Sequence, residues 1–149
     1  MKLKNFKILG ILLLMLTAFA VGDKKVSAAE SSDAQYTIGV VVYNQDSPEM
    51  NMFMNYYRDY IQQGFPVKFY FSGSINSADD EISFIRAMKL QGVSGIISFY
   101  GQDIRKIVEA CDEEQMYYVL GSGSISDEDY EQVKTSPYFL GSVGPDAKA

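Results

Sequence analysis

Two short segments, 43–46 and 99–103, combine carboxylates, amides and aromatic rings within a few residues of one another. Carboxylates and amides accept or donate several hydrogen bonds, and an aromatic ring offers a flat apolar surface. Together these groups suit a small ligand that carries hydroxyl groups around an apolar face. The candidate ligand-binding residues are Tyr43, Asn44, Asp46, Phe99, Tyr100 and Asp103.

Structural roles are the alternative for most of these residues. Asp46 can cap a following helix or solvate a loop, and Asp103 lies where a helix should begin. Tyr43 and Tyr100 can be packing residues at the ends of strands. The sequence leaves both interpretations open for each residue.

No catalytic residue, metal site or cofactor is predicted. The chain contains no histidine, which removes the usual general base, the usual zinc ligand and the Ser-His-Asp triad. The adjacent acidic residues 79–81 point in different directions around a helix, so they favour helix capping over metal binding. The segment Gly121–Ser124 lacks the spaced glycine fingerprint, which favours a turn over a phosphate cradle.

Segments of strand and helix character alternate along the chain and would position these loops. The predicted strands are 36–43, 66–71, 95–98, 116–120 and 138–143. The predicted helices are 50–63 after Ser47 as N-cap, a helix from Ser77 or Asp79 towards Gly92, 101–115, and a short one at 126–133. This order predicts an α/β fold, with a parallel sheet of about five strands and helices on both faces, Rossmann-like or flavodoxin-like. Ligands of such sheets bind at the carboxyl ends of the strands, where 44–47, 99–103 and 121–126 lie.

Helical spacing of apolar residues predicts which helix faces meet the sheet. In the first helix the inward residues are Met50, Phe53, Met54, Tyr57 and Ile61. In the third helix they are Ile104, Ile107, Val108 and Cys111. Both sets are interpreted as core.

Residues 1–29 have the pattern of a secretory signal peptide. Three lysines in the first seven residues precede the apolar run Ile8–Gly22. That run is shorter than the roughly 20 residues of a membrane-spanning helix. Small residues near its exit predict cleavage after Ala28 or Ala29, with an uncleaved signal anchor as the alternative.

The chain after the leader is predicted to be extracytoplasmic, either periplasmic or secreted, and not lipid-anchored. Its single cysteine, Cys111, lies far from the leader, so neither a lipid anchor nor an internal disulfide is expected. Residues 30–35 are predicted to be a polar tether. The leader holds five lysines and one aspartate of the chain's 13 basic and 19 acidic residues, so the remainder carries a net charge of −10. Such a surface repels nucleic acid and anionic lipid.

Four segments carry a family resemblance through their order and spacing. They are Ile38–Pro48, the stretch from Asp80 through the Gln-Gly-Val-x-Gly-Ile-Ile step to Ser98, Ile104–Leu120, and Ser136–Asp146. Together they resemble the N-terminal lobe of the periplasmic sugar-binding proteins of ABC importers, of the ribose- and galactose-binding type. The resemblance covers nearly all of residues 36–149.

The resemblance implies a non-catalytic solute-binding lobe. Its ligand would be a sugar or another polyol, and its partner an ABC permease or a membrane sensor. Many family members carry aromatic residues after a proline in the first loop, whereas this chain has Pro48-Glu49-Met50, so Tyr43 or Phe99 would have to supply stacking. Family members are about twice as long, so residues 36–149 are expected to be one lobe without the second, and a single lobe should bind weakly.

Two other function classes remain as alternatives. One is a one-lobe interaction or sensory module, able to dimerise through its exposed half-cleft. The other is an enzyme on a flavodoxin-like sheet. The enzyme is less favoured, because the first loop lacks a phosphate cradle for a flavin and the first strand lacks the acidic pair of a phospho-receiver domain.

Overall fold

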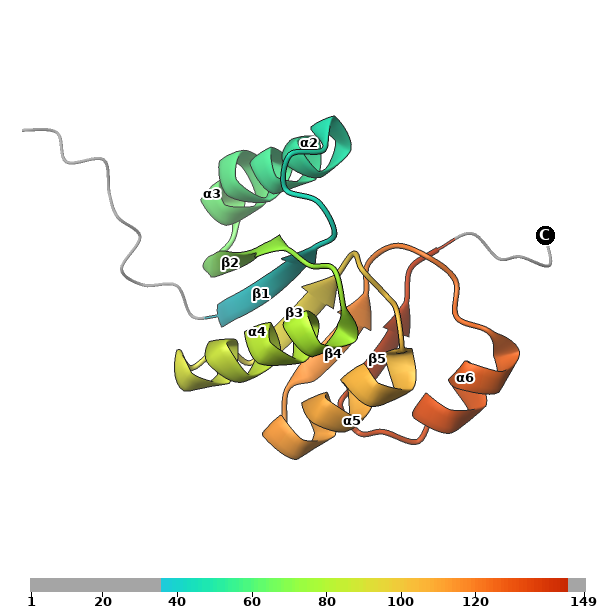
Figure 1. The fold of residues 1–149 in the computed structure, drawn as a ribbon. Coiled ribbons are helices and arrows are strands. Elements are labelled where there is room, and N and C mark those ends of the chain that lie inside the picture. Colours follow the sequence, from blue (N-terminus) through green and yellow to red (C-terminus); the bar gives the residue numbers. More distant parts are fainter. Residues whose placement is uncertain (1–35, 145–149) are drawn as a thin grey trace, which may run out of the picture. The chain divides into compact units, whose positions relative to one another are not determined.

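Five strands form one sheet in the computed structural model, which describes residues 36–144 (Figure 1). The strands are β1 (Tyr36–Val42), β2 (Val67–Ser74), β3 (Gly95–Ser98), β4 (Tyr117–Leu120) and β5 (Phe139–Ser142). The helical segments are α2 (Pro48–Tyr56), the π-helix η1 (Tyr57–Ile61), α3 (Gln62–Gly64), α4 (Ala78–Leu90), α5 (Ile104–Glu114) and α6 (Asp127–Val133). The predicted leader, the tether and the end of the last predicted loop lie outside the described residues.

All strand pairs are parallel, in the order β2-β1-β3-β4-β5. Figure 1 shows α2 and α3 on one side of the sheet and α4 and α5 on the other. The predicted α/β class, with its parallel sheet of five strands and helices on both faces, is therefore confirmed.

The core lies on both faces of the central strands. Val41 belongs to the hydrophobic cluster shared with α4 and α5, whereas Val40 and Val42 belong to the cluster under α2. Successive side chains of a strand point to opposite faces, so a run of valines without polar interruption is what a doubly covered strand requires. The inward faces predicted for the first helix, which spans α2 and η1, and for α5 are confirmed, since their residues all join these clusters.

The start of α2 differs in detail from the prediction. Ser47 occupies the N-cap position and Pro48 follows as the first helical residue, but the Ser47 side chain makes no capping hydrogen bond. Instead, the side-chain amide of Asn51 donates to the carbonyl oxygens of Gln45 and Ser47. Hydrogen bonds from α2 therefore hold the preceding loop in place.

Strand β2 is longer than predicted, because residues 72–74 continue it rather than forming a loop. Ser72 is buried and its Oγ accepts a hydrogen bond from the backbone N–H of Val42 at 3.0 Å. Beyond the strand, the backbone N–H of Ile75 donates to the carbonyl of Val42 at 3.0 Å. Pairing with β1 thus provides hydrogen-bond partners for residues 72–74, a polar stretch that the sequence pattern alone assigns to a loop.

Ser77 and the acidic residues after it have different roles at the start of α4. Ser77 caps the helix by accepting from the backbone N–H of Asp80. Asp79 forms an ion pair with Lys106 of α5, with 2.6 Å between Oδ1 and Nζ. Glu81 is wholly buried, which corrects the expectation that all three residues serve only to cap the helix.

The inner face of α5 carries the chain's one cysteine. Cys111 has no exposed surface, and burial raises the pKa of its thiol to about 12. This confirms its predicted place in the core.

Across residues 36–144, no helix has the length and apolar character needed to cross a membrane.

Candidate functional site

The carboxyl ends of β1 and β3 form the point where the chain reverses its direction across the sheet. From β1 the chain continues to β2 on one side, and from β3 it continues to β4 on the other. Loops that leave in opposite directions open a crevice between them, and this is the ligand position of such sheets. The two predicted candidate segments follow these neighbouring strands, and the N–H of Phe99 donates to the carbonyl of Val41 at 2.9 Å.

The first loop is held by its own hydrogen bonds. The side-chain oxygen of Asn44 accepts from the backbone N–H of Asp46 at 3.0 Å, so this acceptor is already in use. The backbone N–H of Gln45 donates to Ser74 Oγ at 3.1 Å. The carboxylate of Asp46 is exposed and makes no hydrogen bond or ion pair with the described residues. The carboxylate of Asp46 is therefore available to a ligand.

Tyr43 is partly committed to the neighbouring helix. Its hydroxyl donates to Glu49 Oε2 in the first turn of α2 at 3.1 Å. The side chain is nevertheless exposed. Tyr43 therefore lies at the surface of the loop rather than in the core.

The second loop places its two aromatic residues differently. Phe99 is only 8% exposed, and its ring centroid lies 5.2 Å from that of Phe53 in α2. Little of Phe99 is left for a ligand to stack on. Tyr100 is half-buried and its hydroxyl donates to Gln102 Oε1 at 3.1 Å. Desolvation, together with nearby carboxylates such as Glu81, raises the pKa of Tyr100, so its hydroxyl stays protonated at neutral pH.

Asp103 has an unusual backbone conformation. It has a left-handed conformation with φ of 50° at the N-cap of α5, and its side chain makes no capping hydrogen bond. Capping, the structural alternative for Asp103, is therefore wrong. Gly101 has φ of 67°, and a Cβ there would lie 2.7 Å from Leu120 Cδ1, so the turn demands glycine for two reasons. Left-handed backbone at a non-glycine residue costs about 1–3 kcal/mol and is frequent in ligand-binding loops.

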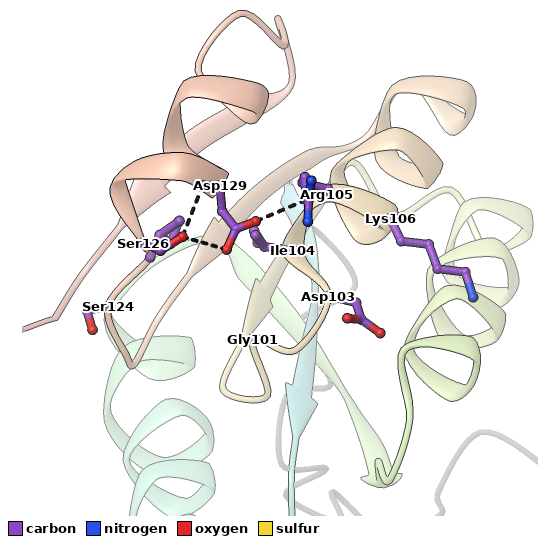
Figure 2. A pocket seen from close by; sticks show the side chains of 9 residues that line it. Gly101, Asp103, Ile104, Arg105, Lys106, Ser124, Ser126 and Asp129 are labelled. Atoms are coloured by element: carbon purple, nitrogen blue, oxygen red, sulfur yellow. Dashed lines mark hydrogen bonds and ion pairs between the residues drawn. The ribbon is translucent and has the colours of Figure 1, made fainter.

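A polar pocket of about 430 Å³ opens between the starts of α5 and α6 (Figure 2). Asp103, Arg105 and Lys106 line it from one side, and Ser124, Ser126 and Asp129 from the other. Arg105 Nε lies 3.0 Å from Asp129 Oδ1, and Ser126 Oγ donates to Asp129 Oδ2 at 2.7 Å. The Asp129 carboxylate is thus fixed by two partners, whereas Asp103 makes no ion pair or side-chain hydrogen bond with the described residues.

The residues on the α6 side of this pocket were not predicted as site residues. The loop 121–126 was predicted to lie at the carboxyl end of a strand, but no ligand contact was predicted in it. The useful signal was the position of Arg105, two residues after Asp103, at the start of a helix facing that loop. Its charge partner Asp129 is distant in sequence, and only the crossover from β4 to β5 brings it near.

A buried carboxyl group lies beneath the second loop. Glu81 Oε1 accepts from the hydroxyl of Tyr118 at 3.1 Å, while Oε2 has no hydrogen-bond partner in the described structure. Burial raises the pKa of Glu81 to about 7, although the hydroxyls of Ser98 and Tyr118 act in the opposite direction. Ser98 also accepts from the backbone N–H of Tyr100 at 3.1 Å, which connects this group to the candidate site.

The chemistry of this edge suits binding of neutral polar groups. Carboxylate, guanidinium and hydroxyl groups surround the pocket, and each can bond a ligand hydroxyl. Within residues 36–144, no three potential metal-ligating side chains come together. The arrangement therefore offers hydrogen-bonding groups for a ligand with several hydroxyls.

Comparison with known proteins supports the fold. The chain is similar to a galactofuranose-binding protein of known structure, with a TM-score of 0.56 and 15% identity, over 74% of this chain and 36% of that one. The chain therefore spans about a third of the length of that protein. A type II dehydroquinase from Butyrivibrio crossotus is matched with a TM-score of 0.42 and 17% identity, over 73% of this chain and 87% of that one. No protein-family model and no curated protein matches the sequence significantly.

Proposed function

We propose that this chain binds a small polyhydroxylated solute, most of all a sugar, without carrying out chemistry on it. The observation that carries the proposal is the polar pocket beside Asp103, lined by the loops after β3 and β4 at the carboxyl end of a sheet whose fold is shared with a galactofuranose-binding protein. Sugar hydroxyls would donate to the carboxylate of Asp103 and accept from Arg105, whereas Asp46 does not line this pocket.

The proposed mechanism is a change of conformation on binding rather than catalysis. A lobe of this kind would close on its ligand together with a second lobe, and a permease or membrane sensor would recognise the closed form. The likeness to about a third of the galactofuranose-binding protein supports assigning one lobe to this chain. One lobe buries only part of a ligand, so we expect affinities in the millimolar range.

An NMR titration tests the proposal. Residues 30–149, which contain the described sheet and both of its hydrophobic clusters, would be titrated with ribose, galactose and methyl galactofuranoside. We expect at least one sugar to shift backbone amide signals of 99–106 and 122–129. Asp103→Asn should weaken that binding about 10-fold or more, because a hydrogen bond to a charged group contributes roughly 1.5–3 kcal/mol.

Asp59→Asn is the matched control, since it makes the same chemical change on η1, outside the pocket lining. Affinity should be unchanged in this variant. Absence of signal shifts with all three sugars at about 50 mM would refute the proposal. Equal weakening by both substitutions would instead indicate a general charge effect rather than a contact from Asp103.

A further inference from the structure

Within residues 36–144, one face of the sheet is left uncovered over β3, β4 and β5. An apolar groove of about 320 Å³ lies there, and none of its lining residues is charged. The side chains that form it come from four strands: Tyr36, Ile38, Ile97, Tyr117, Val119 and Leu140. It is distinct from the polar pocket, with which it shares no residue.

The groove lies on the same face as α2 but beyond its reach. The cluster under α2 is built on β1 and β2, through residues such as Val40 and Phe69, and Ile38 and Ile97 are only packed at its margin. Arg58 lies over Phe71 of the edge strand β2, 4.5 Å from the ring centroid. The flank of the helical segment α2–η1 that carries Arg58 therefore faces the β2 edge of the sheet, away from β4 and β5.

The same helical segment carries an exposed apolar stripe. Met52, Tyr56 and Tyr60 recur every four residues, and the rings of Tyr56 and Tyr60 stack at 5.2 Å. Tyr56 and Tyr60 lie two residues before and after Arg58, roughly half a helical turn away, so they lie on the flank opposite the one that meets β2. A groove and an apolar helix stripe are therefore presented on one side of the molecule.

The area of these two surfaces matches a dimer interface. Tyr36, Tyr117, Leu140 and the three stripe residues are each between 50% and 66% exposed. An aromatic side chain has a total surface of roughly 150–250 Å². At these exposed fractions, the six side chains together expose on the order of 650 Å² per copy. Two copies would bury about 1,300 Å² in total, within the roughly 1,200–2,000 Å² of stable specific interfaces.

We propose that the groove is occupied by the Met52–Tyr56–Tyr60 stripe of a second copy of this chain. A two-fold axis would place the helical segment of each copy on the open sheet face of the other, so both surfaces of both copies are used at once. The absence of charged residues from the groove lining removes direct repulsion at the contact, although the chain is acidic as a whole. The carboxyl ends of the strands, where the polar pocket lies, stay outside this interface.

Sedimentation velocity of residues 30–149 tests the proposal. We expect the unsubstituted protein to sediment as a dimer at about 50 µM, and Leu140→Lys to be monomeric at the same concentration, because a charge would be buried in an apolar contact. Tyr56→Lys, on the other half of the interface, should have the same effect. Far-UV circular dichroism would verify that each variant is folded.

Leu90→Lys is the matched control. Leu90 is 90% exposed at the end of α4, which covers the opposite face, so this variant makes the same change in charge and should remain a dimer. A monomeric unsubstituted protein at 100 µM would overturn the proposal. So would a dimer that survives both Leu140→Lys and Tyr56→Lys, since the contact would then lie elsewhere.

Discussion

Two sequence features of Glu81, its helical spacing and its charge, predict opposite positions for it. It lies four and seven residues before Ile85 and Met88, a spacing that places it on the inner face of α4, and those two residues are buried as well. Its charge favours a surface position instead. The helical spacing prevails, and Tyr118 provides the hydrogen bond that makes burial tolerable.

We predict that Glu81 makes the stability of the fold depend on pH. Its pKa is raised from 4.5 to about 7, so the folded state prefers the protonated form. The stabilising contribution is fully present below about pH 4.5 and is lost as the pH rises through about 7. Urea denaturation at about pH 5 and pH 8 should show a loss of roughly 2.5 kcal/mol in the free energy of unfolding.

Glu81→Gln should remove this pH dependence while keeping an acceptor for Tyr118. Glu109→Gln makes the same change on the exposed side of α5 and should leave the pH dependence as it is. A pH dependence that persists unchanged in Glu81→Gln would show that another group is responsible.

At the scale of elements, the sequence predicts strands and helices well where burial decides them. Strand β3 has the predicted bounds, because Gly95–Ser98 is a short apolar run that packs between two strands. Residues 72–74 were misassigned, since their pairing with β1 depends on a partner about 30 residues away. The left-handed backbone of Asp103 also has no local sequence signal, since aspartate is not a residue that requires this conformation.

The N-terminus of α4 gives a second stability prediction. Ser77 Oγ accepts from the backbone N–H of Asp80 at 3.1 Å, which satisfies a donor that the helix cannot satisfy itself. Ser77→Ala should therefore lower the free energy of unfolding by about 1 kcal/mol in chemical denaturation. Ser83→Ala is the control, because Ser83 donates to a carbonyl within the helix and should have a smaller effect. An equal loss in the two variants would argue against a capping role.

At the scale of the molecule, strand order is what assembles the candidate site. The sequence predicted which loops follow the strands, and the sheet order explains why the loops after the neighbouring strands β3 and β4 line one pocket. It did not predict the pairing of Arg105 with Asp129, which depends on how α5 and α6 pack. Alternation of elements therefore predicts where a ligand should bind but not the full set of groups that meet it.

The predicted leader gives an expectation for the molecule as a whole. If residues 1–29 are removed on export, protein recovered from outside the cytoplasm should begin at Ala29 or Glu30, as measured by N-terminal sequencing and intact mass. Replacing Ala28 and Ala29 together with a bulky residue should block or shift cleavage, whereas the same change at Ser31 and Ser32 should not. Recovery of the protein only with an intact Met1 would support the uncleaved anchor instead.

The buried thiol of Cys111 has a practical consequence. Its pKa of about 12 and its lack of exposed surface leave it unreactive towards maleimides and iodoacetamide in the folded protein. Because it is the chain's only cysteine, one introduced at a chosen surface position would be the sole site of attachment for a fluorophore or spin label. The native sequence therefore already serves as a cysteine-silent background for site-specific labelling.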